Sequence, residues 1–335
     1  ADALIKKAQN LEIGFIGSKN GIESRLYKKR NEKYYLLNIK GIKRSFHPID
    51  ILKNIFIFPA ICFVSIVKVI KIYTRFKPNL IIGTGGYSSA IPLFVARLKN
   101  IRIIIQEQNA IPGLVNKLFL KKAYKVCFGF KPEKMANNFL DTGNPTFLYE
   151  NSKNFKNAVF DSNNKFTIFI IGGSQGSVPI NKHFIKNYKF YLDMGIRLIW
   201  QCGKNNISSL KDIIQNEDIH LFGFINPSDM PYYYSKADLV ISRAGALTLS
   251  ELSNFHVASI LIPFPFSANN HQFHNAQYFH LKGAAQIVEQ RELVEGILES
   301  KVEKIINNIE IIKLMREKNK KIAKPDAAKM IASEV

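Results

Sequence analysis

The chain has 335 residues, of which 47% are hydrophobic and 22% are charged. This composition excludes a largely disordered protein, and the length is sufficient for two domains that each bury a core of their own. The 47 Lys and Arg residues against 26 Asp and Glu residues give a formal net charge of +21. Such a charge favours an anionic partner, but nucleic acid, an anionic membrane and a phosphorylated substrate would all satisfy it.

The N-terminal residues lack the pattern of a secretory signal, which favours a cytoplasmic protein. The three cysteines, Cys62, Cys127 and Cys202, are far apart and predict reduced structural thiols. Residues 1–10 have an amphipathic helical pattern and lead directly into the apolar run 11–16. Because a doubly wound domain normally begins with a strand and a phosphate-facing loop, we expect that a first strand and loop are absent here. A variant that begins with a helix is the alternative.

Short apolar runs alternate with amphipathic stretches, as in buried parallel strands joined by helices. The runs form two series, each predicting one doubly wound sheet: residues 11–16, 80–83, 101–105 and 125–128, then 166–171, 197–200, 239–242 and 259–262. A Gly-Asn-Pro turn at 143–145 and the asparagine-rich stretch 151–164 separate them. We therefore predict an N-terminal domain over residues 1–149 and a C-terminal domain over 150–335. Residues 289–333 are predicted to be helical and could pack on either domain.

An apolar run occupies residues 55–67 of the first domain, but it is too short to span a membrane and is interrupted by Pro59. Basic residues flank it on both sides: Lys40, Lys43 and Arg44 before it, and Lys68, Lys71 and Arg75 after it. This combination suits a surface that dips into anionic lipid. A buried helix with a solvated basic face is the competing interpretation.

Two polar segments of the first domain follow predicted strands. Residues 83–89 form a glycine-rich loop of a size that suits a phosphate, and Glu107, Gln108 and Asn109 follow the next strand. Open α/β sheets bind ligands beyond the carboxyl ends of their strands, so both segments are candidates for a binding site. By itself, Glu107 could equally be a capping or loop carboxylate.

In the second domain, the Gly-Gly-Ser-Gln-Gly segment 172–176 lies between a predicted strand and a predicted helix over residues 178–191. Glycines allow close approach of the backbone to a pyrophosphate, and the helix N-terminus favours negative charge. The hydroxyl of Ser174 can add a donor. A tight turn without a ligand explains an isolated glycine cluster equally well.

Two later segments add to this picture. Residues 242–251 begin a helix with small side chains and place Glu251 about one and a half turns inside it, where a carboxylate can accept both hydroxyls of a ribose. Residues 268–276 carry hydrogen-bonding side chains that suit a polyhydroxylated ligand. His271 and His274 have no clear third ligand, so we predict no metal site. For Glu251 the alternative is a solvated charge near a helix N-terminus, and for residues 268–276 the alternative is ordinary surface residues.

In combination, residues 83–89, 107–116, 172–176, 242–251 and 271–276 resemble the bacterial MurG family in order and spacing. The resemblance implies an α/β GT-B fold, in which two Rossmann-like doubly wound domains face an interdomain cleft. It also implies inverting transfer of GlcNAc from UDP-GlcNAc to the lipid-linked precursor lipid I, giving lipid II for peptidoglycan, without a metal or another cofactor. The enzyme would act at the cytoplasmic face of the inner membrane as a peripheral protein on its anionic surface.

The resemblance assigns donor contacts to twelve residues: Asn109, Ser174, Gln175, Ile225, Ala246, Leu247, Thr248, Leu249, Ser250, Glu251, His271 and Gln272. Glu251 would hold the ribose, the backbone of Ile225 would meet the uracil, and His271 and Gln272 would read the sugar hydroxyls. The acceptor diphosphate would face a second set: Gly85, Gly86, Tyr87, Ser88 and Glu107.

The sequence departs from the family pattern at catalytically important places. It has no counterpart of the histidine-containing N-terminal glycine loop, the favoured candidate for activating the acceptor hydroxyl. Gln106 stands where many members have His, and Phe147 stands near the usual donor-contacting Arg. Neither can supply the same proton chemistry or charge. We therefore assign no general base, and Glu107 is only an outside candidate.

Two other functions account for part of these features. Another GT-B enzyme, such as a UDP-GlcNAc 2-epimerase, would share the fold and the nucleotide without a lipid acceptor. A non-catalytic protein that binds an anionic ligand would account for the positive charge. No recognisable nucleic-acid-binding motif accompanies that charge, so we predict no nucleic-acid partner.

Overall fold

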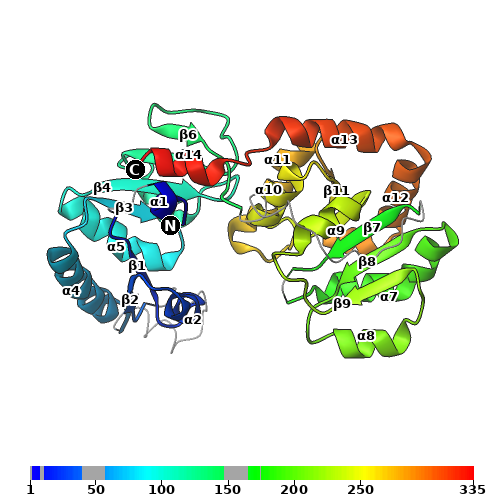
Figure 1. Cartoon of the computed structure of the whole chain (residues 1–335), viewed down its shortest axis with the longest axis horizontal. Helices are drawn as coiled ribbons and strands as arrows, with labels where there is room; N and C mark the ends of the chain where they lie inside the picture. The colour runs from blue at the N-terminus through cyan, green and yellow to red at the C-terminus, as the bar shows by residue number, and fades with distance from the viewer. Residues whose placement is uncertain (1, 8–10, 40–56, 147–164, 174) are drawn as a thin grey trace. The chain divides into compact units, whose positions relative to one another are not determined.

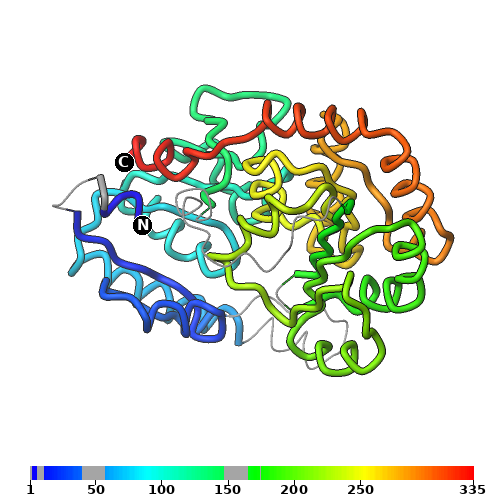
Figure 2. The backbone as a smooth tube through the Cα atoms, turned by 45° about the vertical axis from the view of Figure 1, so that its right-hand side comes forward, coloured from blue at the N-terminus to red at the C-terminus, as the bar shows by residue number. Residues whose placement is uncertain are grey.

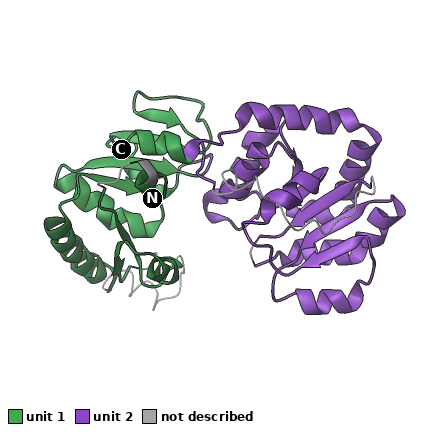
Figure 3. Cartoon of the chain, viewed as in Figure 1, with its two compact units in different colours: residues 1–108, 112–142, 328–335 green, residues 109–111, 143–327 purple. Residues whose placement is uncertain are grey.

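The structure, a computed structural model, describes residues 2–7, 11–39, 57–146, 165–173 and 175–335. The chain divides into two compact units (Figure 3): unit 1 comprises residues 1–108, 112–142 and 328–335, and unit 2 comprises residues 109–111 and 143–327. The boundary predicted between residues 149 and 150 lies outside the described residues. So do five residues named above: Lys40, Lys43, Arg44, Phe147 and Ser174.

Unit 1 is built on parallel strands, as the apolar runs predict. Its four-stranded sheet has the order β3 (Leu80–Gly83), β4 (Arg102–Glu107), β5 (Lys125–Phe128) and β6 (Phe139–Asp141). A separate parallel pair is formed by β1 (Gly14–Ser18) and β2 (Lys33–Leu37). The helical segments are α1 (Asp2–Lys7), α2 (Glu23–Leu26), η1 (Tyr27–Lys29), α4 (Phe58–Phe76), α5 (Tyr87–Leu98) and α6 (Leu114–Phe119). Helices α4, α5 and α6 and the strands bury a core that includes Val69, Leu93, Ile105 and Val126.

Unit 2 contains one six-stranded parallel sheet covered by helices (Figure 1). The strand order is β12 (Gln286–Ile287), β11 (Ala258–Leu261), β10 (Leu239–Ser242), β7 (Thr167–Ile171), β8 (Arg197–Gln201) and β9 (Ile219–Phe222). The helical segments before the C-terminal region are α7 (Val178–Asp193), α8 (Ile207–Ile213), α9 (Met230–Lys236), α10 (Ala246–Asn254), η3 (Ala268–Asn270) and α11 (His271–Leu281). The side chains of β7 are all buried, since this central strand is covered on both faces.

The C-terminal region is helical, as predicted, but it is divided into several segments. These are η4 (Gln290–Val294), α12 (Ile297–Asn307), α13 (Ile309–Ile322) and α14 (Ala327–Ser333), and Figure 2 shows the path of the backbone through them. Gly296 has a φ of +72°, and Asn308 accepts a hydrogen bond from the amide of Glu310, so local turn chemistry separates the helices. The sequence left open where this region packs. In the structure Leu298 and Val302 enter the core of unit 2, whereas Ile331 joins Ile104 and Cys127 in unit 1.

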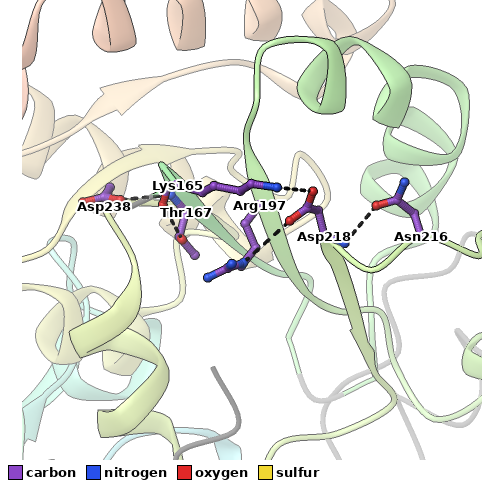
Figure 4. Close-up of polar contacts among 6 residues, drawn as sticks. All are labelled: Lys165, Thr167, Arg197, Asn216, Asp218 and Asp238. Atoms are coloured by element: carbon purple, nitrogen blue, oxygen red, sulfur yellow. Dashed lines mark hydrogen bonds and ion pairs between the residues drawn. The ribbon is translucent and has the colours of Figure 1, made fainter. Parts of the chain in front are cut away.

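Charged side chains join the amino ends of the unit 2 strands (Figure 4). Lys165 Nζ lies 2.7 Å from Asp218 Oδ2, and Arg197 Nε lies 4.0 Å from Asp218 Oδ1. The amide of Thr167 donates to Asp238 Oδ2 at 2.9 Å. These contacts stabilise the sheet where its strands begin. The carboxyl ends of the strands are therefore left for a ligand.

The apolar run of the first domain enters helix α4, where the interpretation of Pro59 was wrong. Pro59 occupies the first turn of α4 and does not interrupt it, because a proline there loses no hydrogen bond that the helix needs. The exposed side chains of α4 include Phe63 and Val64 in its first half, and Lys71 and Arg75 in its second. Among the described helices, none combines the length and hydrophobicity required to cross a bilayer.

Candidate donor and acceptor sites

The parallel topology of unit 2 brings the predicted donor segments to one edge of the sheet. Gln175 follows β7, Ile225 follows β9, helix α10 follows β10, and helix α11 follows β11. Because all these strands run in the same direction, their carboxyl ends lie at the same edge. The structure therefore brings together segments as far apart in the chain as residues 172 and 272.

The glycine loop 172–176 packs closely against the chain that follows β8. Gly176 has a φ of +78°, and a Cβ atom there would lie 2.0 Å from the carbonyl oxygen of Cys202. Gly203 has a φ of +96°, and its Cβ would lie 2.3 Å from the carbonyl oxygen of Gln175. Only glycine permits both contacts, so these positions are required by close backbone approach as well as by the turn.

Helix α10 offers backbone amides at its first turn. Its N-cap residue is Gly245, and the amide of Leu249 already donates to the Gly245 carbonyl at 3.0 Å. The Leu249 side chain is fully buried. The hydroxyl of Ser250 donates to the carbonyl of Ala246 and accepts from the side chain of Asn144, both at 3.0 Å. Amides available to a ligand therefore belong to residues 246–248 rather than to Leu249 and Ser250.

Glu251 is held by a buried tyrosine from another helix. The hydroxyl of Tyr234 on α9 donates to Glu251 Oε2 at 2.8 Å. Burial raises the pKa of Glu251 to about 7, although the Tyr234 hydrogen bond acts in the opposite direction. The carboxyl group is therefore positioned by one oxygen, and it titrates close to neutral pH.

The segment predicted to read the sugar has an unusual backbone. Asn269 and Asn270 both have a φ of +52°, a left-handed conformation that is uncommon outside glycine and often marks a functional site. His271 Nδ1 lies 2.8 Å from the carbonyl of Ala268, so this nitrogen carries the proton. Gln272 Oε1 accepts from the amide of Phe264 at 3.0 Å, which orients the Gln272 amide group.

Asn275 connects the donor segments with the Asn109 segment, which belongs to unit 2. Its Nδ2 donates to Asn109 Oδ1 at 3.1 Å and to the carbonyl of Ala244 at 3.2 Å. Its Oδ1 accepts from the amide of Ala110 at 2.8 Å. A fully buried side chain thus places Asn109 beside the loop that precedes α10.

Arg243 is a further organising residue, which lies within the 242–251 segment and received no role from the sequence. Its guanidinium donates to the carbonyls of Ile262 and Pro263 at 3.1 Å, to the Ser177 hydroxyl at 2.7 Å and to Gln290 Oε1 at 2.6 Å. Burial lowers the pKa of Arg243 to about 10. The residue joins the loops after β7, β10 and β11 and keeps a positive charge near the glycine loop. Its position directly after a predicted strand was the available signal.

In unit 1, one of the predicted acceptor residues, Glu107, is a buried carboxylate. Glu107 is 2% exposed, and its Oε2 accepts from Asn116 Nδ2 at 2.8 Å and from the amide of Gly113 at 2.9 Å. A Cβ atom on Gly85 would lie 3.1 Å from the same Asn116 amide nitrogen. This geometry favours a role for Glu107 in ordering the loops over a role as a base, because a base must reach the reacting hydroxyl.

The other acceptor residues lie at the start of α5. Gly85 and Gly86 have φ values of +86° and +75°, and Gly86 is the N-cap residue. Tyr87 is exposed, and the Ser88 hydroxyl lies 3.4 Å from Glu23 Oε1. A glycine turn therefore leads into a helix N-terminus at the carboxyl end of β3, an arrangement that suits an anionic group. Among the described residues, no three His, Cys, Asp or Glu side chains are grouped to hold a metal ion.

Comparison with known proteins connects these sites to one family. Residues 1–128 match the glycosyltransferase family 28 N-terminal domain, and residues 167–331 match the corresponding C-terminal domain. A transferase of Vesicomyosocius okutanii is 35% identical over 331 residues, which cover 99% of this chain and 90% of that protein. It is named UDP-N-acetylglucosamine--N-acetylmuramyl-(pentapeptide) pyrophosphoryl-undecaprenol N-acetylglucosamine transferase. The chain belongs to this transferase family. A relative with the same name from Caldicellulosiruptor saccharolyticus is 33% identical, with 99% of this chain and 90% of that protein covered.

Solved structures agree with the family assignment. MurG of Acinetobacter baumannii has a TM-score of 0.77 and 26% identity, covering 99% of this chain and 93% of that chain. The calicheamicin glycosyltransferase CalG4 has a TM-score of 0.72 at 10% identity, covering 99% and 91% of the two chains, so this likeness concerns the fold alone. The GT-B fold and the MurG-family resemblance predicted from the sequence are therefore confirmed, and the chain is a glycosyltransferase of family 28. The roles of individual site residues stay predictions.

Proposed function

We propose that this chain transfers GlcNAc from UDP-GlcNAc to the undecaprenyl-pyrophosphoryl-MurNAc-pentapeptide lipid I, giving lipid II. Full-length similarity to relatives named for this reaction carries the proposal. The loops at the carboxyl ends of the unit 2 strands support it. They offer amides for a diphosphate, a carboxylate for a ribose and polar side chains for a sugar.

In the proposed donor complex, each part of UDP-GlcNAc contacts a different segment of unit 2. The diphosphate lies at the glycine loop and at the amides of Ala246, Leu247 and Thr248, and Arg243 adds positive charge nearby. Glu251 holds the ribose, and Ile225 lies at the uracil. Ser174, Gln175, His271, Gln272 and Asn109 complete the donor contacts. Helix N-termini and amides then stabilise the negative charge that develops on the departing UDP.

The proposed reaction is a direct displacement. The acceptor hydroxyl oxygen bonds to the anomeric carbon as the bond from that carbon to UDP breaks, which inverts the configuration. The hydroxyl proton passes to a base that we do not assign to a residue of this chain. The loop that contains Gly85, Gly86, Tyr87 and Ser88 faces the acceptor diphosphate in this proposal, and Glu107 fixes the Asn116 amide group that lies next to Gly85.

Transfer of labelled GlcNAc from UDP-GlcNAc to a lipid I analogue tests this function. We expect labelled lipid II and UDP in equal amounts, and no labelled product when the acceptor is omitted. Binding of UDP to the same chain is measured in parallel. A chain that binds UDP but forms no lipid II would exclude the proposal. Release of free sugar epimer without acceptor would identify the epimerase alternative.

Helix α4 supports a second proposal, docking on an anionic membrane at the cytoplasmic face of the inner membrane. Phe63 is 68% exposed and Val64 is 65% exposed, which is unusual for large apolar side chains in one helix. Lys68, Lys71 and Arg75 follow on the exposed part of the same helix, and Lys68 Nζ also donates to the carbonyl of Leu36 at 2.8 Å. Apolar insertion and attraction to anionic headgroups would act together on this surface.

Reversing the three basic charges is expected to weaken binding to vesicles of phosphatidylglycerol and phosphatidylethanolamine by at least about 100-fold. Each basic residue near such a surface contributes about 1 kcal/mol, and glutamate adds repulsion. Co-sedimentation of the Lys68→Glu, Lys71→Glu, Arg75→Glu variant measures the effect. The matched control changes three exposed lysines of α7, Lys182, Lys186 and Lys189, to glutamate. Equal losses in both variants would show that net charge, and not the α4 surface, governs binding.

A further inference from the structure

The side chain of Gln201 bridges two segments of the proposed donor site. Gln201 is the last residue of β8, which lies between β7 and β9 in the unit 2 sheet. Its Nε2 donates to the carbonyl of Gly173 at 3.2 Å, and its Oε1 accepts from the amide of Ile225 at 3.0 Å. One side chain therefore joins the glycine loop after β7 to the turn after β9.

The chemistry of the two partners fixes the orientation of the Gln201 amide. A carbonyl oxygen can only accept a hydrogen bond, and a backbone N–H can only donate one, so the reversed amide would face two mismatched partners. Gln201 is 4% exposed. Water cannot readily replace either partner at such a buried position, so the loss of these bonds leaves polar groups unsatisfied.

Glycine contacts connect the same segments independently of this side chain. Gly176 and Gly203 lie against the carbonyls of Cys202 and Gln175, as described above, so the glycine loop rests directly on the residues that follow Gln201. On the other side, a Cβ atom on Gly223 would lie 3.3 Å from the Cα atom of Lys204. The loops after β7, β8 and β9 thus form one packed layer, and Gln201 lies within it.

We propose that Gln201 is a positioning residue that couples the uracil-binding and diphosphate-binding parts of the donor site. The inference rests on the proposed function, since it takes UDP-GlcNAc as the donor. When the uracil binds, it orders the turn at Ile225, and Gln201 transmits this order to the glycine loop. The diphosphate then binds a loop that is already in place. Gln201 acts through Gly173 and Ile225 rather than by touching the reacting atoms.

Two substitutions separate the two bonds. Gln201→Met keeps a similar length and removes both bonds, and it is expected to weaken UDP binding about tenfold and uridine binding about threefold. Gln201→Glu keeps an acceptor for Ile225 but places a carboxylate oxygen against the Gly173 carbonyl. It is expected to leave the uridine Kd within twofold and to weaken UDP binding more than tenfold. Calorimetry with UDP and with uridine measures both ligands.

Kinetics and a matched variant distinguish positioning from general destabilisation. Both variants are expected to raise KM for UDP-GlcNAc more than they lower kcat. Asn206→Ala is the control, because Asn206 donates to the Cys202 carbonyl at 3.0 Å, and that oxygen keeps a second donor in Asn181. This control is expected to lower the Tm slightly and to leave both Kd values unchanged.

The outcomes separate this inference from the proposed function. Parallel weakening of uridine and UDP in Gln201→Glu, or UDP binding within twofold of wild type in both variants, overturns the coupling. A wild-type chain that binds UDP and shows the expected split between the variants, but never transfers GlcNAc, supports the coupling and overturns the transferase proposal.

Discussion

Replacing Glu251 by alanine is expected to lower kcat/KM for UDP-GlcNAc by about 100-fold, mainly through a higher KM. The carboxylate can accept both ribose hydroxyls, and each hydrogen bond to a charged group contributes about 1.5–3 kcal/mol. Tyr234 holds one carboxylate oxygen at 2.8 Å, so the group is ordered before the donor arrives. Steady-state kinetics at several donor concentrations separate KM from kcat.

Two comparison variants make this result interpretable. Glu251→Gln keeps an acceptor for Tyr234 but loses the charge, and it is expected to cost about tenfold. Glu310→Ala removes an exposed acid on α13 that lies 2.6 Å from Lys313, and it is expected to leave KM unchanged. If Glu251→Ala retained the wild-type KM, Glu251 would have no role in ribose binding.

The same carboxyl group predicts a pH dependence. Burial raises the pKa of Glu251 to about 7 in the ligand-free chain, and the ionised form is the one that accepts both hydroxyls. The Kd for UDP should therefore rise as the pH falls below 7, by up to about the tenfold cost expected for Glu251→Gln, and level off above pH 7. The folded pKa also exceeds the usual 4.5, so between pH 4.5 and 7 the unfolded chain loses the Glu251 proton while the folded chain keeps it. The free energy of unfolding therefore falls as the pH rises from 4.5 to 7.

Variants test the origin of this pH profile. Glu251→Gln should flatten the profile of UDP binding, since it has no proton to lose. Tyr234→Phe should move the inflection to higher pH, because the Tyr234 hydrogen bond favours the ionised carboxylate. Calorimetric titrations from pH 5.5 to 8.5 would check both shifts, and an unchanged profile in Glu251→Gln would assign it to another group.

Gly176→Ala is expected to weaken UDP binding by about 100-fold or more. A Cβ atom at this position would lie 2.0 Å from the Cys202 carbonyl oxygen, and Gly176 has a φ of +78°. The backbone of the glycine loop must shift to relieve the contact, and a displacement of about 1 Å in a positioned group can cost 100-fold. Calorimetry with UDP measures the loss, and circular dichroism confirms that the chain still folds.

Gly195→Ala is the matched control for this prediction. Gly195 has a φ of +71°, similar to that of Gly176, but a Cβ atom there meets nothing within 4 Å. Its substitution introduces the backbone strain, about 1–2 kcal/mol, without the collision. We expect a lower Tm and an unchanged Kd, so comparable losses of UDP binding in both variants would refute the role of close packing in the glycine loop.

The strands that the sequence predicted are mainly the covered ones. The apolar runs at 80–83, 125–128 and 239–242 correspond to β3, β5 and β10 without a shift of bounds. All central strands of the two larger sheets were predicted, together with the edge strands β1 and β3. The strands that the apolar runs did not predict are β2, β6, β9 and β12, and each lies at the edge of its sheet. An edge strand has less surface covered than a central one, so its sequence need not be a continuous apolar run.

The sequence by itself predicted the family and the candidate site of this protein, because glycine turns, helix starts and Glu251 are local features that a motif displays. Only the tertiary structure decided which side chains hold those features in place: Gln201, Tyr234, Arg243 and Asn275. Their partners lie on other segments of the chain, mostly in loops, from 17 residues away for Tyr234 and Glu251 to 166 for Asn109 and Asn275. No local pattern records such a pairing, since it arises when parallel strands bring distant loops to one edge of the sheet.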